Sequence, residues 1–144
     1  LTHDGFTLNL DTIPIDDELT YKLYQEGRTV FRYAVTDMGN DVEEVLKRNE
    51  MTTEDVNWVI PHEANLRIIE AVAKRINLPL EKVVVNIQRY GNTSAATIPL
   101  ALWDHERHLK KGDNIIFTAF GAGFVHGASY YKWGYDGATV AGAQ

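Results

Sequence analysis

Two residues of this chain have side chains that could stabilise negative charge developing on a substrate oxygen. His62 directly follows a short apolar run that ends at Pro61, and Asn92 lies in the turn sequence Gly91-Asn92-Thr93-Ser94. An imidazole donates or accepts protons near neutral pH, and a carboxamide is a neutral hydrogen-bond donor. Preorganised donors of this kind stabilise the enolate of a thioester more than its ground state.

Both residues also have a purely structural interpretation. His62 could be a satisfied histidine at a strand end, and Asn92 could be a turn residue that caps the next helix. Asn92-Thr93-Ser94 also matches a glycosylation sequon. We do not expect its use, because the sequence contains no export signal.

A third candidate is the turn Gly121-Ala122-Gly123, whose small residues would let backbone amides approach a ligand closely. Such amides could complete an oxyanion hole, although the local sequence alone favours a tight hairpin turn. The glycines do not form a dinucleotide-binding fingerprint, because their spacing is wrong and a strand follows them.

The histidines do not form a convincing metal site. His105 and His108 are three residues apart among charged neighbours, which favours a solvated helix face over metal ligation. His62-Glu63 begins a metalloprotease pattern, but Leu66 occupies the position of the second histidine. We therefore expect no metal.

The elements that must position these residues follow from periodicity and turn signals. Apolar residues at helical spacing predict a long helix over residues 26–48, which Gly39 could bend. We then expect a buried strand at 58–60, a helix from Ala64, a strand at 82–87, a helix at 94–109 kinked or re-started at Pro99, and strands at 114–120 and 128–133.

This order predicts an α/β fold with a mixed, mainly parallel sheet, helices packed on it and one antiparallel strand at the end. The carboxyl ends of parallel strands meet at one edge, so His62 and Asn92 should project into a common crevice there. We assign residues 1–20 to a lead-in segment with a possible partial strand around Phe6, residues 21–134 to the domain, and residues 135–144 to a tail.

Composition excludes several classes of function. The chain has 144 residues, with 14 basic against 20 acidic side chains and a net charge of -6, which argues against general nucleic-acid binding. No long apolar run suggests a membrane span, and the cytoplasm is the expected location. Cysteine is absent, so any thiol chemistry must be supplied by another polypeptide or by a part of the enzyme outside this sequence.

Taken together, three segments resemble the signature of the type III beta-ketoacyl-acyl-carrier-protein synthases, members of the thiolase superfamily, in order and spacing. The segments are Trp58-Val-Ile-Pro-His62-Glu-Ala-Asn65-Leu-Arg67, Val83-Val-Val-Asn-Ile-Gln-Arg-Tyr-Gly91-Asn92-Thr-Ser-Ala-Ala and Phe120-Gly-Ala-Gly-Phe. The resemblance runs from about Gly27 to Trp133 and implies a C-terminal, thiolase-like half. In that family the cysteine nucleophile belongs to the N-terminal half.

The resemblance implies a reaction and roles for the candidate residues. A short acyl group would pass from coenzyme A to the cysteine, and malonyl-acyl-carrier-protein would then lose carbon dioxide and attack it. His62 and Asn92 would hold the malonyl thioester oxygen, and the backbone amide of Ala122 would help to hold the acyl oxyanion. The coenzyme A thioester is a substrate, and no cofactor is required.

The family also implies partners. Its basic residues near the active-site mouth dock the acidic acyl carrier protein, and the matching positions here are Arg32, Arg67, Lys74 and Arg75. Phe31, Ala64 and Asn65 match the channel for the pantetheine arm. A homodimer is expected. Glu63 departs from the glutamine common in the family, and its carboxylate would raise the pKa of His62 if it lay close.

Two other functions remain open from the sequence. One is a related priming synthase or acyltransferase of polyketide metabolism, which would use another acyl donor or acceptor. The other is a non-catalytic subunit that supports a catalytic relative. The presence of both His62 and Asn92 favours a catalytic protein over this second alternative.

Overall fold

The computed structural model describes residues 2–3, 6–7 and 26–137 of the chain. Two compact units are present, residues 1–30 and 31–144. In the first unit, β1 (Thr2–His3) and β2 (Phe6–Thr7) form an antiparallel pair. The expected boundary between residues 20 and 21 lies outside the described residues, as does the tail from residue 138 onward, so both stay predictions.

The second unit is built on a three-stranded mixed sheet. Its strands are β3 (Trp58–Pro61), β4 (Asn114–Gly121) and β5 (Val125–Lys132), in the order β3-β4-β5. β3 pairs with β4 in parallel, and β5 runs antiparallel to β4. The predicted mixed α/β class with a final antiparallel strand is therefore confirmed, although β5 starts at Val125, three residues before the predicted position.

The prediction of a strand over residues 82–87 is wrong for most of its length. Only one isolated parallel bridge, between Val59 and Val83, joins this segment to the sheet. After Val84 the chain leaves the sheet, because the Asn86 N–H donates to both carboxylate oxygens of Glu63, at 2.9 and 3.0 Å, instead of to β3. The short helix α3 (Ile87–Tyr90) follows, so Asn92 comes after a helix and not after a strand.

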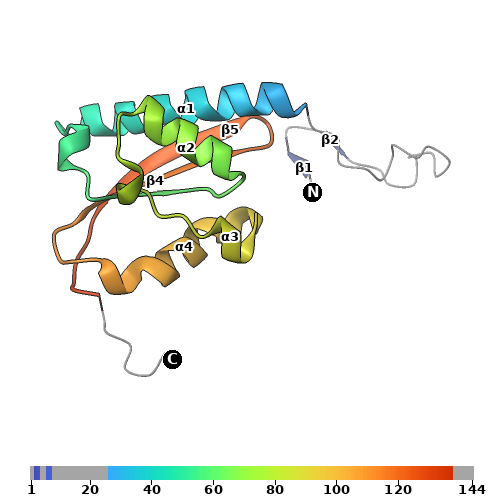
Figure 1. Cartoon of the computed structure of the whole chain (residues 1–144). Coiled ribbons are helices and arrows are strands. Elements are labelled where there is room, and N and C mark those ends of the chain that lie inside the picture. The colour runs from blue at the N-terminus through green and yellow to red at the C-terminus, as the bar shows by residue number, and fades with distance from the viewer. Residues whose placement is uncertain (1, 4–5, 8–25, 138–144) are drawn as a thin grey trace. The chain divides into compact units, whose positions relative to one another are not determined.

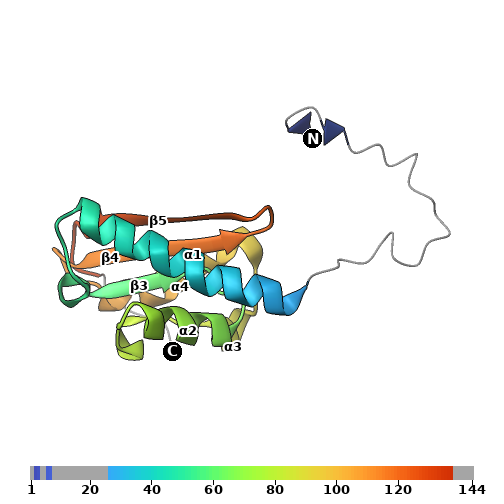
Figure 2. The same ribbon diagram turned by 90° about the horizontal axis from the view of Figure 1, so that it is seen from above.

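Helices cover both faces of the sheet (Figure 1). The helices α1 (Gly27–Arg48) and α2 (Leu66–Arg75) lie side by side over one face, as the view from above shows (Figure 2). The helix α4 (Thr97–His105) lies on the other face with α3. Each layer has its own core, one containing Val42, Val59, Ile69 and Ile116, and the other containing Ile60, Ala101, Leu109 and Ile115.

Local sequence explains the helix boundaries that differ from expectation. α2 begins at Leu66, because Asn65 caps it by accepting a hydrogen bond from the Arg67 N–H at 2.9 Å. α1 continues through Gly39, which is buried at a point where an added Cβ would overlap the side chain of Arg75. α4 is not interrupted at Pro99, because proline is tolerated in the first turn of a helix.

No helix in residues 26–137 is long and apolar enough to cross a membrane.

Candidate active site

His62 is held at the carboxyl end of β3, beside β4. Its backbone N–H donates to the Thr118 carbonyl at 2.7 Å, which continues the contact between the two strands past Pro61. The imidazole is half-buried, and its Nδ1 lies 2.6 Å from Thr97 Oγ1. Burial lowers the pKa of His62, so the ring is neutral at neutral pH and carries one N–H.

Asn92 is exposed in the turn between α3 and α4. Its Oδ1 accepts a hydrogen bond from the Ser94 N–H at 2.9 Å. Asn92 therefore lies in a turn, as expected, but it is not the cap of the next helical segment, because Thr93 is the N-cap of the 3-10 turn that follows. That contact occupies the oxygen of the carboxamide, whereas its nitrogen, Nδ2, makes no hydrogen bond among the described residues. The nitrogen is the group that remains to serve a ligand.

One short segment links the two candidate residues. The hydroxyl of Thr97, which contacts His62, lies 3.0 Å from the Ser94 carbonyl oxygen. Ser94 in turn holds Asn92 through its own N–H, and Ser94–Ala96 forms a single 3-10 turn. Thr97 directly follows this turn, so both side chains are anchored to the Ser94–Thr97 segment. Their convergence on one substrate oxygen stays a prediction.

Ala122 lies at the tip of the hairpin between β4 and β5. The ladder between these strands ends at the pair Gly121 and Val125, so Ala122 lies outside it. Gly123 has a φ of 141°, a conformation that favours glycine. Phe124 packs on Tyr33 of α1, with ring centroids 5.4 Å apart. The tip is exposed, and the oxyanion role of its amide stays a prediction.

Glu63 does not act on His62 as an ion-pair partner. Its carboxylate is completely buried and accepts from the Asn86 N–H, which directs it away from a role as a base beside the imidazole. Burial raises the pKa of Glu63, and the nearby Asp104 carboxylate adds to this effect. The pKa of His62 is lowered by burial and is not raised by its neighbour.

The channel and docking residues predicted from the sequence are partly brought together. The guanidinium of Arg67 lies 5.8 Å from the centre of the Phe31 ring, and the Arg67 N–H is bound by Asn65. Ala64 is half-buried between His62 and Asn65. These residues form a group at the N-terminal end of α2, close to His62 in sequence.

The remaining basic residues differ in whether their side chains already contact other residues of the chain. Lys74 is exposed, and Arg32 lies with its guanidinium 5.0 Å from the centre of the Tyr33 ring. Arg75 instead turns toward α1, where it donates to Asn40 Oδ1 and lies 3.7 Å from Glu43. A role of Arg75 in docking would require it to exchange these contacts.

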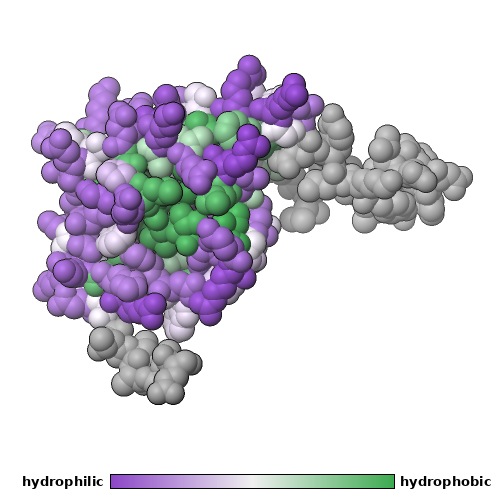
Figure 3. Space-filling model, in the orientation of Figure 1, coloured by the Kyte–Doolittle hydropathy of each residue, from purple (hydrophilic) through white to green (hydrophobic). Residues whose placement is uncertain are grey.

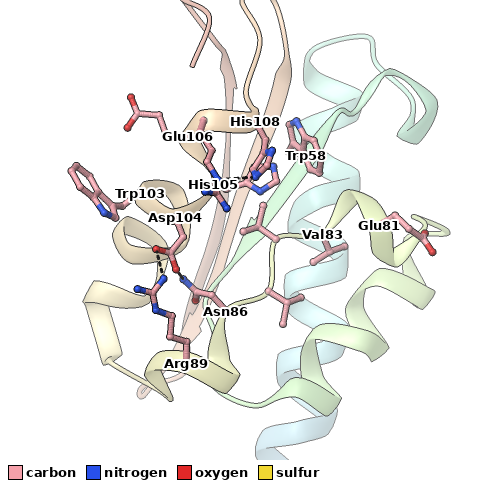
Figure 4. A pocket seen from close by; sticks show the side chains of 13 residues that line it. Trp58, Glu81, Val83, Asn86, Arg89, Trp103, Asp104, His105, Glu106 and His108 are labelled. Atoms are coloured by element: carbon pink, nitrogen blue, oxygen red, sulfur yellow. Dashed lines mark hydrogen bonds and ion pairs between the residues drawn. The ribbon is translucent and has the colours of Figure 1, made fainter. Parts of the chain in front are cut away.

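A hollow of about 990 Å³ lies away from these residues, and neither His62, Asn92 nor Ala122 lines it (Figure 4). Within it, Asp104 accepts hydrogen bonds from Asn86 at 3.1 Å and from Arg89 at 3.2 Å. Tyr90 also donates to Asp104, at 3.1 Å. This polar network fixes the segment between residue 83 and α3 against α4.

The prediction that His105 lies on a solvated helix face is wrong. Its ring is half-buried against Trp58, with ring centroids 4.1 Å apart (Figure 4). The ring centroids of His105 and His108 are 5.2 Å apart. Burial lowers the pKa of His105 to about 4. Residues 26–137 contain no group of three His, Cys, Asp or Glu residues placed to hold a metal ion.

Sequence reasoning missed two residues of the site. Thr97 is 2% exposed and contacts His62 directly, and Thr118 is 1% exposed and accepts the His62 N–H through its carbonyl. The signal for Thr97 was its position at the first residue of a helix that begins just after Asn92. No comparable signal marks Thr118, because it lies next to His62 only through the pairing of β3 with β4.

Comparison with known proteins gives a consistent family assignment. Residues 46–133 match the family described as "3-Oxoacyl-[acyl-carrier-protein (ACP)] synthase III C terminal". The chain is 63% identical over 123 residues to a beta-ketoacyl-[acyl-carrier-protein] synthase III of Phocaeicola vulgatus, which covers 85% of this chain and 36% of that protein. For the corresponding protein of Porphyromonas gingivalis, the identity is 57% over 124 residues, with 86% of this chain and 37% of that protein covered.

Solved structures give the same result. The 3-oxoacyl-[acyl-carrier-protein] synthase III of Aquifex aeolicus matches with a TM-score of 0.76 and 45% identity, over 81% of this chain and 38% of that chain. The priming beta-ketosynthase of the R1128 polyketide pathway matches with a TM-score of 0.74 and 31% identity, over 86% and 38%. The chain spans little more than a third of the length of these proteins.

Proposed function

Because the chain belongs to the 3-oxoacyl-[acyl-carrier-protein] synthase III family, whose C-terminal domain it contains, we propose that it is the C-terminal part of a condensing enzyme that initiates fatty acid synthesis. The observation that carries this proposal is the pair His62 and Asn92, each anchored to the Ser94–Thr97 segment within a chain 63% identical to a named synthase III. The domain also has the thiolase-like fold of that family.

The proposed reaction joins a short acyl-CoA with malonyl-acyl-carrier-protein. A cysteine thiolate of the N-terminal half attacks the acyl thioester and releases coenzyme A as a thiolate, which takes a proton from solvent. The malonyl group then loses carbon dioxide, and the resulting carbanion attacks the acyl-enzyme. A carbon–carbon bond forms, the cysteine is released, and the product is 3-oxoacyl-acyl-carrier-protein. The chain itself has no cysteine, so this step depends on the other half.

His62 and Asn92 would supply hydrogen bonds to the malonyl thioester oxygen. Loss of carbon dioxide places negative charge on this oxygen, and donors fixed before the reaction stabilise that charge without reorganising. The two anchoring contacts support this role, because Thr97 and Ser94 restrain the groups that must be in place. The backbone amide of Ala122, together with that of the cysteine, would hold the oxyanion of the acyl thioester.

The carrier protein would dock on the α1 and α2 side of this site. Arg32, Arg67, Lys74 and Arg75 all belong to these two helices and would meet its acidic surface. Phe31, Ala64 and Asn65 would line the path of the pantetheine arm. The closeness of Phe31, Asn65 and Arg67 supports a mouth at the start of α2.

An N-terminal half would cover apolar surface that this chain leaves exposed. Figure 3 shows an apolar area between α2 and α4 on the face toward the viewer. On the α4 side, Trp103 is 73% exposed and Tyr131 is 54% exposed. Large exposed apolar patches commonly mark interaction sites. We include in the proposal a homodimer of the complete enzyme and a cytoplasmic location, both implied by the family.

A priming synthase of polyketide metabolism is the second candidate, since the R1128 enzyme shares the fold at 31% identity. The higher identity to the Phocaeicola vulgatus synthase III favours fatty acid synthesis. The two candidates differ in acyl donor, so profiling of the acyl chains that the complete enzyme accepts would separate them.

The proposal can be tested with a chimera in which this chain replaces the matching C-terminal part of the Phocaeicola vulgatus synthase III. We expect the chimera to form 3-oxoacyl-acyl-carrier-protein from an acyl-CoA and malonyl-acyl-carrier-protein. The unaltered Phocaeicola enzyme is the positive control, and a chimera without the cysteine is the negative control. A folded chimera that forms no product from any acyl-CoA would reject the proposal in favour of a non-catalytic subunit.

A further inference from the structure

Thr97 is a buried hydroxyl in direct contact with the imidazole of His62. It is 2% exposed, and its Oγ1 lies 2.6 Å from Nδ1 of the ring. A buried hydroxyl at this distance shares a hydrogen with the ring nitrogen. Which of the two atoms donates decides where the single proton of a neutral imidazole sits.

Two hydrogen arrangements fit these positions, because a hydroxyl has only one proton. The proton of Thr97 could go to the Ser94 carbonyl oxygen, 3.0 Å away, in which case His62 Nδ1–H donates to Oγ1. Nε2 would then carry no hydrogen. Alternatively, the proton goes to Nδ1, and Nε2 carries the ring hydrogen. Only the second arrangement makes Nε2 a donor.

The proposed function selects the second arrangement, because only there can Nε2 donate to a substrate oxygen. The Ser94 carbonyl keeps a hydrogen bond in that arrangement, since it also accepts from the Thr97 backbone N–H. His62 Nδ1 has no partner other than Thr97 among the described residues, and Nε2 has none there. In the second arrangement Nδ1 therefore accepts from the one hydroxyl within reach, and Nε2 is left to donate to a ligand.

We propose that Thr97 is a positioning residue that donates to Nδ1 of neutral His62 and thereby keeps the ring proton on Nε2, facing the substrate oxygen. This inference rests on the proposed function, which requires Nε2 to donate. It also gives the Ser94–Thr97 segment a combined role. The Ser94 N–H orients the carboxamide of Asn92, and the Thr97 hydroxyl selects the tautomer of His62.

The tautomer can be observed directly in the full chain. Histidine labelled with nitrogen-15 gives distinct long-range proton–nitrogen correlation patterns for the two neutral tautomers. The chain has five histidines, and a His62→Gln variant assigns the resonances of this ring. We expect the Nε2–H form of His62 at neutral pH. Observation of the Nδ1–H form would overturn the proposal, whatever the behaviour of any variant.

Substitutions test the cause. Thr97→Val keeps the shape of the side chain and removes the hydroxyl, whereas Thr97→Ser keeps the hydroxyl. We expect the valine variant to lose the tautomer preference and the serine variant to retain it. If both variants show the wild-type pattern, the hydroxyl does not select the tautomer. If the valine variant does not fold, the proposal is decided by the tautomer of the wild type and of the serine variant, which should both be Nε2–H.

Activity of the chimera gives a second, separable readout. Thr97→Val should lower kcat for malonyl decarboxylation by up to about 10²-fold, the typical loss for one oxyanion donor. KM should change little, and Thr97→Ser should restore the rate. An inactive wild-type chimera with the Nε2–H tautomer would reject the proposed function alone. An active chimera with the Nδ1–H tautomer would reject the role of Thr97 alone.

Discussion

At the scale of single residues, the site is organised by contacts that restrain uncharged groups. His62 is neutral because burial lowers the pKa of its ring, and Asn92 has no charge to lose. Neither group needs a carboxylate partner to act as a donor. Neutral donors suit a reaction in which charge appears only on the substrate. They bind an uncharged thioester carbonyl with no more than a hydrogen bond, and they bind the oxygen more strongly once it becomes negative.

Glu63 is the titratable residue closest to His62 in sequence, and its effect should be on stability. Its pKa is raised in the folded protein, so the folded state holds the proton more firmly than the unfolded chain. Stability then falls as pH rises above the usual value of 4.5. We expect Glu63→Gln, which has the same shape without the charge, to be more stable than the wild type at neutral pH.

Urea denaturation across a pH series measures this effect. The difference between Glu63→Gln and the wild type should close as pH falls below 4.5, where both states carry the proton. Glu54→Gln is a matched control on an exposed site. A difference that stays constant across the whole pH range would contradict the assignment of the effect to the buried carboxyl.

Residue types made the two donors predictable, but not the contacts that restrain them. His62 stood out because it follows a buried strand, where α/β proteins place ligands. The expected strand at 82–87 places Asn92 beside it, but that strand is replaced by α3 just before Asn92. The role of Glu63 could not be predicted, because its partner Asn86 is 23 residues away and reaches it only after the chain leaves the sheet. The same holds for Thr97, which is 35 residues from His62.

At the scale of elements, α1 and β5 are joined by an ion pair that responds to pH. His126 Nδ1 lies 2.7 Å from Asp41 Oδ2, and both residues are at least partly exposed. The hydrogen bond to Asp41 raises the pKa of His126, and the charge of Asp37 adds to this effect. The pair connects the helix that would meet the carrier protein to the strand that leads away from the Ala122 turn.

This pair should stabilise the fold only on the acid side. A raised pKa means that the contribution is complete below the usual value of 6.5 and is lost as pH rises through the higher folded value. His126→Asn and Asp41→Asn should each remove this decline in stability. Thermal melts of both variants and of the double variant between mild acid and mild alkali would measure it. If the single variants keep the wild-type decline, the pair is not its source.

The elements themselves were predictable where one physical signal dominated. The long stripe of apolar residues fixed α1, and the β-branched runs fixed β3 and β4. The segment 82–87 misled prediction because three consecutive valines carry a strand signal that a buried carboxylate overrides at Asn86. Strand propensity is a property of residues 82–87 alone, whereas the path of the chain after Val84 depends on a hydrogen bond to Glu63, 23 residues away from Asn86.

At the scale of the whole molecule, each face of the sheet carries two helices and a core of its own. The α4 side nevertheless leaves Trp103 and Tyr131 largely exposed. Phe117 packs edge-on against Tyr131 on this side, with ring centroids 5.2 Å apart. This surface is the one that we expect an N-terminal half to cover.

A charge placed on this surface should therefore block assembly without unfolding the chain. We expect Trp103→Asp to keep the circular dichroism spectrum of the wild type and to weaken association with a separately expressed N-terminal half by on the order of 10² or more, as for a central interface aromatic. Lys47→Asp, on exposed α1, is the control and should bind normally. Equal association of the two variants, measured by sedimentation, would show that the partner binds elsewhere.

The central claim is that His62 and Asn92 act as the two donors for one thioester oxygen, and malonyl-acyl-carrier-protein decarboxylation by the active chimera tests it most directly. His62→Ala and Asn92→Ala should each lower the decarboxylation rate by about 10²–10³-fold, while His108→Ala and Asn49→Ala should leave it unchanged. Full decarboxylation by either His62→Ala or Asn92→Ala would contradict the account.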